Sequence, residues 1–170
     1  MKSKILNIYS WFIRSFLFFL PDIPIIMRLR GCLYSVAMPN CGANFQVSNT
    51  SVLYGLGNLY IGKNVYIAHN VFVGARCRIN IGNDVLIGIN TVMISGNHTL
   101  KNKSFRFGKP NLKPILIEDG VWIASNVTIT AGTRIKKGAL IGSSCSANGD
   151  YDEFSINLGK KATKQKHSNR

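Results

Sequence analysis

Acidic residues are scarce in this sequence. The 170 residues include 7 Asp and Glu against 21 Lys and Arg, so the formal net charge is +14. Such an excess favours an anionic partner, which could be nucleic acid, phospholipid or a phosphate-bearing cofactor. No helix-turn-helix pattern, zinc-finger spacing or aromatic-basic signature accompanies the charge, so we expect no nucleic-acid partner. Fifteen of the 21 cations lie in three segments, at 1–30, 101–113 and 160–170.

Cysteine pairs at metal-binding spacing are absent. The four cysteines are far apart, no C-x-x-C occurs, and no histidine stands close enough to complete a zinc site. We therefore expect reduced thiols in a cytoplasmic protein and no bound metal. The cysteines are Cys32, Cys41, Cys77 and Cys145.

Long uninterrupted hydrophobic runs are also missing. The most apolar stretch, "ILNIYSWFIRSFLFFLP", contains Arg14 and is shorter than the roughly 20 residues of a membrane-spanning helix. No small-residue cleavage site follows it, which argues against a signal peptide. Residues 1–40 therefore predict a short amphipathic helical segment. The sequence leaves open whether its apolar face lies on a membrane surface, at the inner membrane, on a partner subunit or on the protein's own core.

The sequence has instead a repeat of six residues. Aliphatic anchors recur at this spacing within three groups, and three positions after most anchors comes a residue that tolerates a left-handed backbone. The anchors are Ile61, Ile67, Val73, Ile81, Ile87, Met93, Ile117, Ile123, Ile129, Ile135 and Ile141. The corner residues are Asn64, Asn70, Arg76, Asp84, Asn90, Gly120, Asn126, Gly132 and Gly138.

A period of six fits neither an amphipathic helix nor simple strand alternation. It fits a short strand followed by a corner, three of which close a triangular coil of 18 residues around one apolar column. We therefore predict an all-β parallel β-helix of hexapeptide repeats over residues 41–150, with a basic tail at 151–170. Two residues are inserted around Ile79 and Asn80. A much longer break follows Met93 and predicts a loop at about 99–114 that projects from the same corner.

His98 stands at the start of this long break. A histidine at a solvent-facing corner has a pKa near neutrality and is accessible to a substrate, as a general base must be. The other histidines mark no break in the pattern, because His69 precedes the regular corner residue Asn70 and His167 lies in the basic tail. We therefore identify His98 as the candidate catalytic residue.

The stretches "IGKNVYIAHNVFVGARCRINIGNDVLIGINTVMISGNH" and "KPILIEDGVWIASNVTITAGTRIKKGALIGSSC" resemble the hexapeptide-repeat acetyltransferases. The chain is most similar to the maltose, galactoside and nodulation-type sugar O-acetyltransferases and to their relatives that modify capsule or O-antigen sugars. The resemblance covers about 42–166, and its most specific features are the G-x-H before the long loop and the V-W-I at 121–123. It implies that the β-helix is left-handed.

The resemblance also implies a chemistry. His98 would remove the proton from a sugar hydroxyl as that oxygen attacks the thioester of acetyl-CoA, with direct transfer and no acyl-enzyme. Family members are homotrimers whose acyl donor lies between two subunits, and backbone N–H groups would hold the oxyanion. The positions that match cofactor contacts are Ser125, Ser143, Asn148, Gly149, Lys166 and Trp122, of which Trp122 could equally contact the core or the trimer interface.

Departures from the family pattern concern the acceptor. Ala68 and Arg76 stand where maltose and galactoside enzymes have an asparagine and an acidic residue, so we expect neither a simple galactoside nor maltose. A sugar of a surface polysaccharide, or its precursor, is the preferred acceptor. The alternatives are an N-acetyltransferase acting on an amino sugar, an antibiotic or other small-molecule acetyltransferase, and a non-catalytic scaffold. A zinc anhydrase on these coils would lack its third histidine, since only His69 and His98 lie in the repeats.

Overall fold

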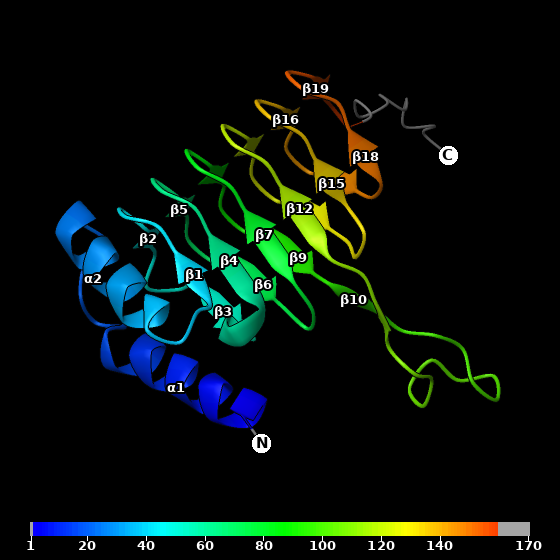
Figure 1. Cartoon of the computed structure of the whole chain (residues 1–170), viewed down its shortest axis with the longest axis horizontal. Coiled ribbons are helices and arrows are strands. Elements are labelled where there is room, and N and C mark those ends of the chain that lie inside the picture. The colour runs from blue at the N-terminus through cyan, green and yellow to red at the C-terminus, as the bar shows by residue number, and fades with distance from the viewer. Residues whose placement is uncertain (1, 160–170) are drawn as a thin grey trace, which may run out of the picture.

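The computed structural model describes residues 2–159, which form two helices followed by a parallel β-solenoid (Figure 1). Helix α1 spans Lys2–Phe16 and helix α2 spans Pro24–Ser35. The sequence predicted one helical segment here. Two helices form because Pro21 and Pro24 interrupt the chain, and Pro24 then suits the first turn of α2, where no backbone N–H is needed. Lys166 lies outside the described residues.

Three parallel sheets make the faces of the solenoid. Sheet A consists of β1 (Asn40–Cys41), β4 (Leu59–Ile61), β7 (Ile79–Ile81), β12 (Ile115–Ile117), β15 (Arg134–Ile135) and β18 (Asp150–Tyr151). Sheet B consists of β2 (Gln46–Val47), β5 (Tyr66–Ile67), β8 (Leu86–Ile87), β13 (Trp122–Ile123), β16 (Leu140–Ile141) and β19 (Ile156–Asn157). Sheet C consists of β3 (Val52–Tyr54), β6 (Phe72–Gly74), β9 (Val92–Ile94), β14 (Thr128–Ile129) and β17 (Ser146–Ala147). A short 3-10 helix, Leu56–Asn58, joins β3 to β4.

All eleven predicted anchors are buried in one core column, which confirms the six-residue reading of the sequence. The column is longer than the set of predicted anchors. A first coil, with Val47 and Leu53 inside, lies within the predicted range 41–150 but ahead of the first anchor, Ile61, and strands β18 and β19 continue past residue 150 into the predicted tail. The fold is therefore a solenoid of six turns in sheets A and B.

Corner residues adopt the left-handed backbone that the sequence predicted, with one exception. Eight of the nine have φ between 56° and 91°, whereas Arg76 does not have a positive φ. Side-chain amides of stacked corners bond to one another, as Asn44 Nδ2 donates to Asn64 Oδ1 at 3.0 Å and Asn90 Nδ2 donates to Asn126 Oδ1 at 3.1 Å. These ladders align each coil on the next.

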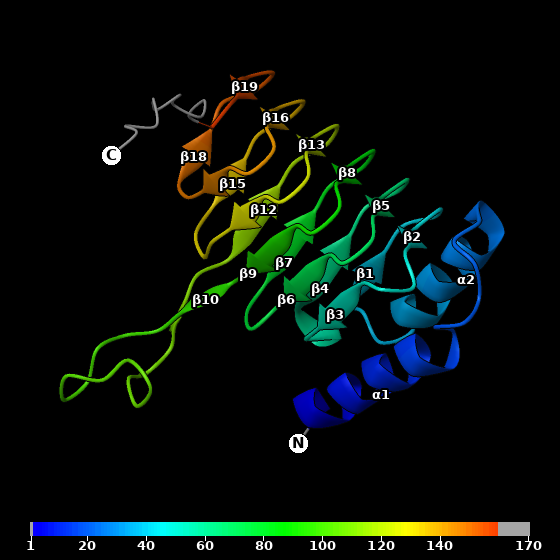
Figure 2. The same ribbon diagram turned by 180° about the vertical axis from the view of Figure 1, so that it is seen from behind.

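The three corners differ in length. Six residues separate equivalent core positions across the corner between sheets A and B, the A–B corner, and across the B–C corner, in every coil. Across the C–A corner the separation is 8, 8, 24, 6 and 4 residues in successive coils. The predicted long loop is a hairpin at this corner, in which β10 (Gly96–Asn97) pairs antiparallel with β11 (Asn111–Leu112) (Figure 2). Every irregularity in coil length thus lies on one edge of the molecule.

The helix pair covers the first coil of the solenoid. Arg30 of α2 is buried, forms an ion pair with Asp22 and donates to the carbonyl oxygens of Leu20 and Val47, so it joins α2 and the connection between the two helices to β2. The packing is close, because a Cβ on Gly31 would clash with the backbone carbonyl of Phe45. Within the described part of the chain, no helix has the length and hydropathy needed to cross a bilayer.

Candidate active site

His98 follows β10 on the C–A hairpin, and its side chain is exposed. It lies at one end of a groove of about 470 Å³. The other residues that line this groove are Tyr54, Phe72, Gly74, Arg76, Ile94 and Gly96. The structure therefore places the predicted base where a substrate can reach it.

The walls of the groove come from three stacked coils. Tyr54, Gly74 and Ile94 are in register on neighbouring strands of sheet C, so they form a short column that leads to His98. Gly74 leaves room in this column, since a Cβ there would stand 3.1 Å from a ring carbon of Phe72. An apolar floor with a few polar groups is typical of small-molecule sites. The six-residue repeat does not predict these residues, because it concerns the inward-facing anchors and not the outer faces of the strands.

Arg76 brings a positive charge to the groove. A Cβ on Gly96 would stand 2.8 Å from Cδ2 of Leu112 and 3.2 Å from Cδ of Arg76, so the glycine allows close packing of the arginine against the hairpin. Between Gly96 and Pro114 the hairpin carries no acidic residue and five cations. These cations are Lys101, Lys103, Arg106, Lys109 and Lys113. The surroundings of His98 are therefore suited to phosphate or another anionic group.

The two histidines of the coils differ in their contacts. His69 has Nδ1 2.8 Å from Ser48 Oγ and Nε2 3.4 Å from Asp22 Oδ2, so both of its ring nitrogens face protein partners. The ring of His98 makes no hydrogen bond to any residue between 2 and 159. Among the contacts of residues 2–159, the ring nitrogens of His98 are therefore free to bind a substrate, whereas those of His69 face protein groups.

The predicted cofactor residues divide between two corners. Asn148 and Gly149 follow β17 of sheet C, so they lie at the C–A corner, like His98. Only β14 lies between β17 and β9, the sheet C strand that precedes His98. Ser125 and Ser143 lie at the B–C corner of adjacent coils, where Ser144 N donates to Ser125 O at 3.0 Å. One side of a coil, of about six residues, separates these two corners by roughly 20 Å. A single chain therefore does not bring all the predicted contacts around His98.

Trp122 lies on the outer face of sheet B and is about half exposed. It is in register with Leu86 on one side and Leu140 on the other, and Tyr66 and Ile156 extend the same row. A row of five outward-facing apolar residues on one sheet is unusual for a face in contact with water. Trp122 therefore belongs to an exposed apolar surface of sheet B and not to the core or to the His98 groove.

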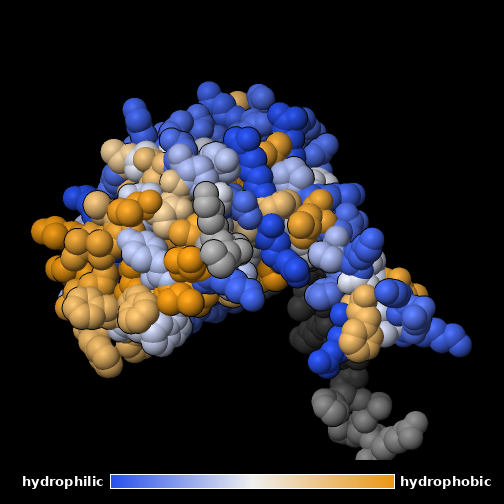
Figure 3. Space-filling view, turned by 60° about the horizontal axis from the view of Figure 1, so that its bottom comes forward, coloured by the Kyte–Doolittle hydropathy of each residue, from blue (hydrophilic) through white to orange (hydrophobic). Residues whose placement is uncertain are grey.

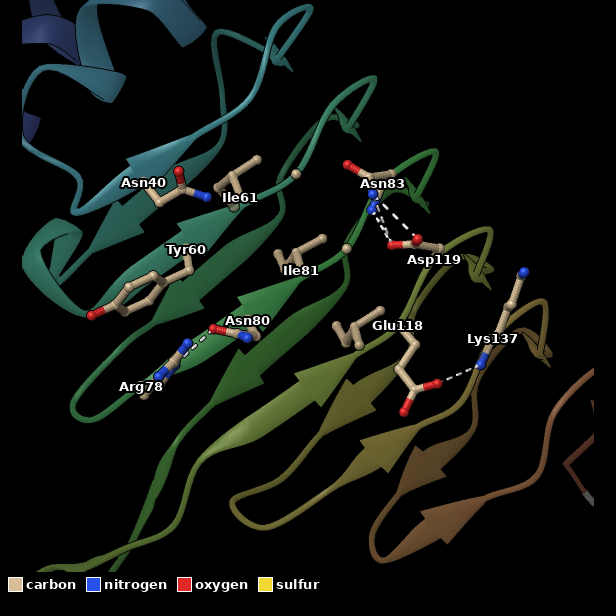
Figure 4. Close-up of a pocket in the computed structure, with 13 residues that line it drawn as sticks. Asn40, Tyr60, Ile61, Arg78, Asn80, Ile81, Asn83, Glu118, Asp119 and Lys137 are labelled. Carbon is tan, nitrogen blue, oxygen red and sulfur yellow. Dashed lines mark hydrogen bonds between the residues drawn. The ribbon is translucent and has the colours of Figure 1, made fainter.

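A second cavity, of about 500 Å³, lies on the outer face of sheet A and at the A–B corner (Figure 4). Several of its polar side chains bond to one another or to residues beside the cavity. Asp119 accepts from the backbone and side chain of Asn83, and Arg78 Nε donates to Asn80 Oδ1 at 2.8 Å. Among its lining residues there is no histidine or cysteine. This cavity offers no free base and is not the candidate site.

Glu118, at the edge of that cavity, is held by Arg134, whose Nη2 lies 2.8 Å from Glu118 Oε1. The hydrogen bond to Arg134 lowers the pKa of the Glu118 carboxyl below its usual value. Glu118 is therefore an ionised structural contact between β12 and β15. Within residues 2–159, no three His, Cys, Asp or Glu side chains are grouped so that they could hold a metal ion.

Comparison with known proteins confirms the resemblance to the hexapeptide-repeat acetyltransferases. A Schizosaccharomyces pombe protein named as an acetyltransferase is 32% identical over 84 residues, which are 49% of this chain and 41% of that protein. WbbJ of Escherichia coli K12, named as an O-acetyl transferase of lipopolysaccharide biosynthesis, is 27% identical over 134 residues, which are 72% of this chain and 68% of WbbJ. The chain thus spans less than half the length of the first relative. No family model matches it.

Solved structures share the fold. The hexapeptide-repeat acetyltransferase VCA0836 of Vibrio cholerae, complexed with acetyl-CoA, superposes with a TM-score of 0.77 at 23% identity and covers 92% of this chain and 83% of its own. A galactoside acetyltransferase in complex with coenzyme A gives a TM-score of 0.78 at 22% identity, covering 92% of this chain and 77% of its own. At these identities the likeness establishes the solenoid architecture.

Proposed function

We propose that this chain is an acetyl-CoA-dependent O-acetyltransferase in which His98 is the general base. The observation that carries the proposal is the position of His98. Its ring is exposed on the one corner that departs from the repeat, at the end of a groove and beside a hairpin of five cations. Acetyl-CoA carries the phosphates that such cations attract, and both solved structures described above were obtained with a coenzyme A ligand.

The reaction requires two proton transfers, one from the acceptor hydroxyl to His98 and one from His98 to the departing thiolate. A ring nitrogen of His98 takes the proton of the acceptor hydroxyl as that oxygen forms a bond to the thioester carbonyl carbon. The negative charge then resides on the carbonyl oxygen, and backbone N–H groups stabilise it. The tetrahedral intermediate collapses by breaking its C–S bond, and the departing thiolate of CoA receives the proton from the imidazolium. No covalent acyl-enzyme is needed, since no cysteine lines the groove.

Two chains share each site in this proposal. His98, Asn148 and Gly149 lie at one corner, whereas Ser125 and Ser143 lie at another, roughly 20 Å away. A neighbouring copy can supply the missing corner, and the apolar row on sheet B is a surface through which copies can associate. A homotrimer closes this contact by rotation, so that no copy is left with an unpaired surface.

The association is tested by Trp122→Glu, which places a charge in the middle of the apolar row. Wild-type protein should sediment as a homotrimer of 18.8 kDa chains, and the variant should sediment as a single chain. Thr128→Glu, on the outer face of sheet C, is the matched control and should leave the assembly intact. A Trp122→Glu protein that remains trimeric would exclude sheet B as the interface.

The acceptor that we propose is a sugar of a surface polysaccharide or of its precursor. The name of the relative WbbJ, which refers to lipopolysaccharide biosynthesis, supports this class. The shape of the surface also supports it. Beyond Tyr54 the His98 groove meets a second groove, of about 250 Å³, between α1 and β3, lined by Asn7, Trp11, Arg14 and others. The two grooves offer room for an acceptor longer than one sugar.

The activity is tested by following release of the CoA thiol with purified protein, acetyl-CoA and a panel of acceptors. His98→Ala should lower acetyl transfer by about 100-fold or more and leave acetyl-CoA binding and assembly unchanged. His69→Gln is the matched control, because it changes the other coil histidine, and it should retain activity. A His98→Ala enzyme with near-normal turnover would disprove the assignment.

The acceptor is tested by measuring the acetyl content of surface polysaccharide in cells with and without the protein. A loss of O-acetyl groups supports the proposal. Unchanged acetyl content, together with activity on an amino sugar or an antibiotic in the panel, would instead establish the alternative N-acetyltransferase or small-molecule reaction.

A further inference from the structure

The outer face of helix α1 is apolar, although its inner face already packs on the solenoid. Ile13 and Leu17 are buried in the core, and Ser10 Oγ donates to Leu53 O. On the opposite side, Phe12 and Phe16 are 60% and 84% exposed. A helix on the surface of a soluble protein normally has polar residues on this side. Something other than the protein's own core must therefore cover it.

The exposed apolar residues of α1 form a stripe along the helix. Ile5, Ile8, Phe12 and Phe16 are spaced by three or four residues, so they lie on one side. Helix α2 repeats the pattern with Ile25 and Leu29, and Val36, just after its end, is exposed as well. We call these two stripes and the exposed Phe18 and Phe19 between them the apolar helix face.

The apolar helix face is continuous at one end of the molecule. Figure 3 brings this end forward and shows hydrophobic surface gathered over the helices on the left, whereas the hairpin on the right is mostly hydrophilic. Tyr9 Oη donates to Leu33 O at 2.8 Å and thereby joins the two helices, and Asn7 Oδ1 accepts from Gly55 N at 3.0 Å. The helices are therefore fixed on the solenoid and present this face as one rigid surface.

The charges around the face have one sign. Lys4 and Arg28 are exposed on the two helices, Arg14 lines the groove beside β3, and Asp22 is the only acidic residue in the first 36. Asp22 is engaged inward by the buried Arg30 and by Asn49 N. The outward field of the helix pair is therefore positive. A surface with aromatic and aliphatic residues at its centre and cations at its edge matches an anionic lipid headgroup layer above acyl chains.

We propose that the apolar helix face docks on an anionic membrane surface, with Phe12, Phe16 and Phe19 inserted below the headgroups and Lys4 and Arg28 among the phosphates. A second copy of the chain fits this face less well. Two such faces in contact would bring like charges together, because every outward charge on the helix pair is positive. The helices lie along the surface and do not cross it, since neither has the length for a span.

The test measures binding of the full-length protein to vesicles by flotation in a density gradient. The vesicles contain phosphatidylethanolamine and phosphatidylglycerol, and a parallel set contains only phosphatidylcholine. Wild-type protein should float with the anionic set and lose this binding as salt is raised. The combined variant Phe12→Ser, Phe16→Ser, Phe19→Ser should lower the partition coefficient by about 100-fold. Lys4→Gln and Arg28→Gln should each lower it by about fivefold.

A matched control changes an aromatic residue of similar exposure elsewhere. Phe107 on the hairpin is 70% exposed, and Phe107→Ser should leave vesicle binding within about twofold. Circular dichroism checks that the triple variant is folded. If it is not, Ile25→Ser with Leu29→Ser tests the same face from α2. The readout is independent of acetyl transfer, so it separates this proposal from the proposed enzyme activity.

Three outcomes would overturn the proposal. The triple variant could bind anionic vesicles as well as the wild type. The wild type could bind neither vesicle set. Finally, sedimentation without lipid could show a larger complex that the triple variant loses, which would assign the apolar helix face to a second copy of the chain.

Discussion

The A–B and B–C corners repeat without change, whereas the C–A corner differs in length from coil to coil. Across the first two corners six residues always separate the core positions, but across the third the number ranges from 4 to 24. The regular corners stack left-handed residues and amide ladders. Segments of unequal length do not place equivalent side chains above one another. Two edges of the prism therefore hold the fold, and the third edge is free to carry a site.

The free energy of unfolding should differ most between a substitution in the core of the regular coils and one in the hairpin at the C–A corner. Ile123→Ala removes a fully buried anchor between two coils and should lower the free energy of unfolding by about 2 to 5 kcal/mol. Leu112→Ala removes a half-exposed side chain of the hairpin and should change it by less than about 0.5 kcal/mol. Urea unfolding at one protein concentration measures both. Equal losses would mean that the hairpin, like the coils, is part of the stabilising structure.

Insertions should distinguish the corners directly. Gly-Ser inserted after Asn90, at the B–C corner, would break the amide bond to Asn126 and the left-handed turn, and should cost about 2 kcal/mol. The same insertion after Gly132, at the C–A corner, restores the eight-residue length of the first coils and should cost much less. The midpoints of urea unfolding give the comparison. A costly insertion at Gly132 would contradict the view that this corner is free to vary.

Single corner residues should show a smaller effect. Asn126 has φ 60°, so Asn126→Ala should cost about 1 kcal/mol through strain and the lost amide bond, and Asn126→Gly should cost less because glycine adopts this conformation freely. Arg76, at the equivalent position of the C–A corner, does not have a positive φ, and Arg76→Ala should be nearly neutral for stability. Thermal unfolding of the three variants orders them.

The smallest effect should be the pH dependence of the Glu118–Arg134 contact. The folded pKa of Glu118 is lowered below its usual value, so the contact stabilises the protein above the unfolded pKa of about 4.5 and its contribution disappears as the pH falls through the folded pKa. Because the pair is exposed to solvent, which screens its charges, this contribution should be the smallest of those compared here. Glu118→Gln should remove that part of the acid dependence, as should Arg134→Gln, and the double variant should add nothing further.

The sequence predicted the core well because each anchor obeys a local rule. Position within the repeat determined burial for all eleven anchors and the backbone conformation for eight of nine corner residues. Arg76 failed because the C–A corner has no fixed length, so the position three residues after Val73 is not the turn position there. Val47 and Leu53 of the first coil obey the same spacing of six, although they were not among the predicted anchors.

The candidate site was predictable only in part. His98 was found because it stands where the repeat stops, and the structure places it at a groove. Tyr54, Phe72 and Ile94 face outward, where the repeat imposes no residue type, so nothing in the periodicity distinguished them. Ser125 and Ser143 lie at another corner than His98, and in the proposed trimer their relation to it depends on a second chain, which one sequence does not reveal.

The close packing of Gly31 on Phe45 and the inward-facing Arg30 hold the helix pair over the first coil, where the parallel sheets end. Strands β1, β2 and β3 are the end strands of their sheets, and a bare coil there would offer unpaired backbone groups to the last coil of another molecule. Helices α1 and α2 lie against β2 and β3 and occupy that end. Loss of the Arg30 contact should therefore expose the strand edges of the first coil and favour their pairing with another chain.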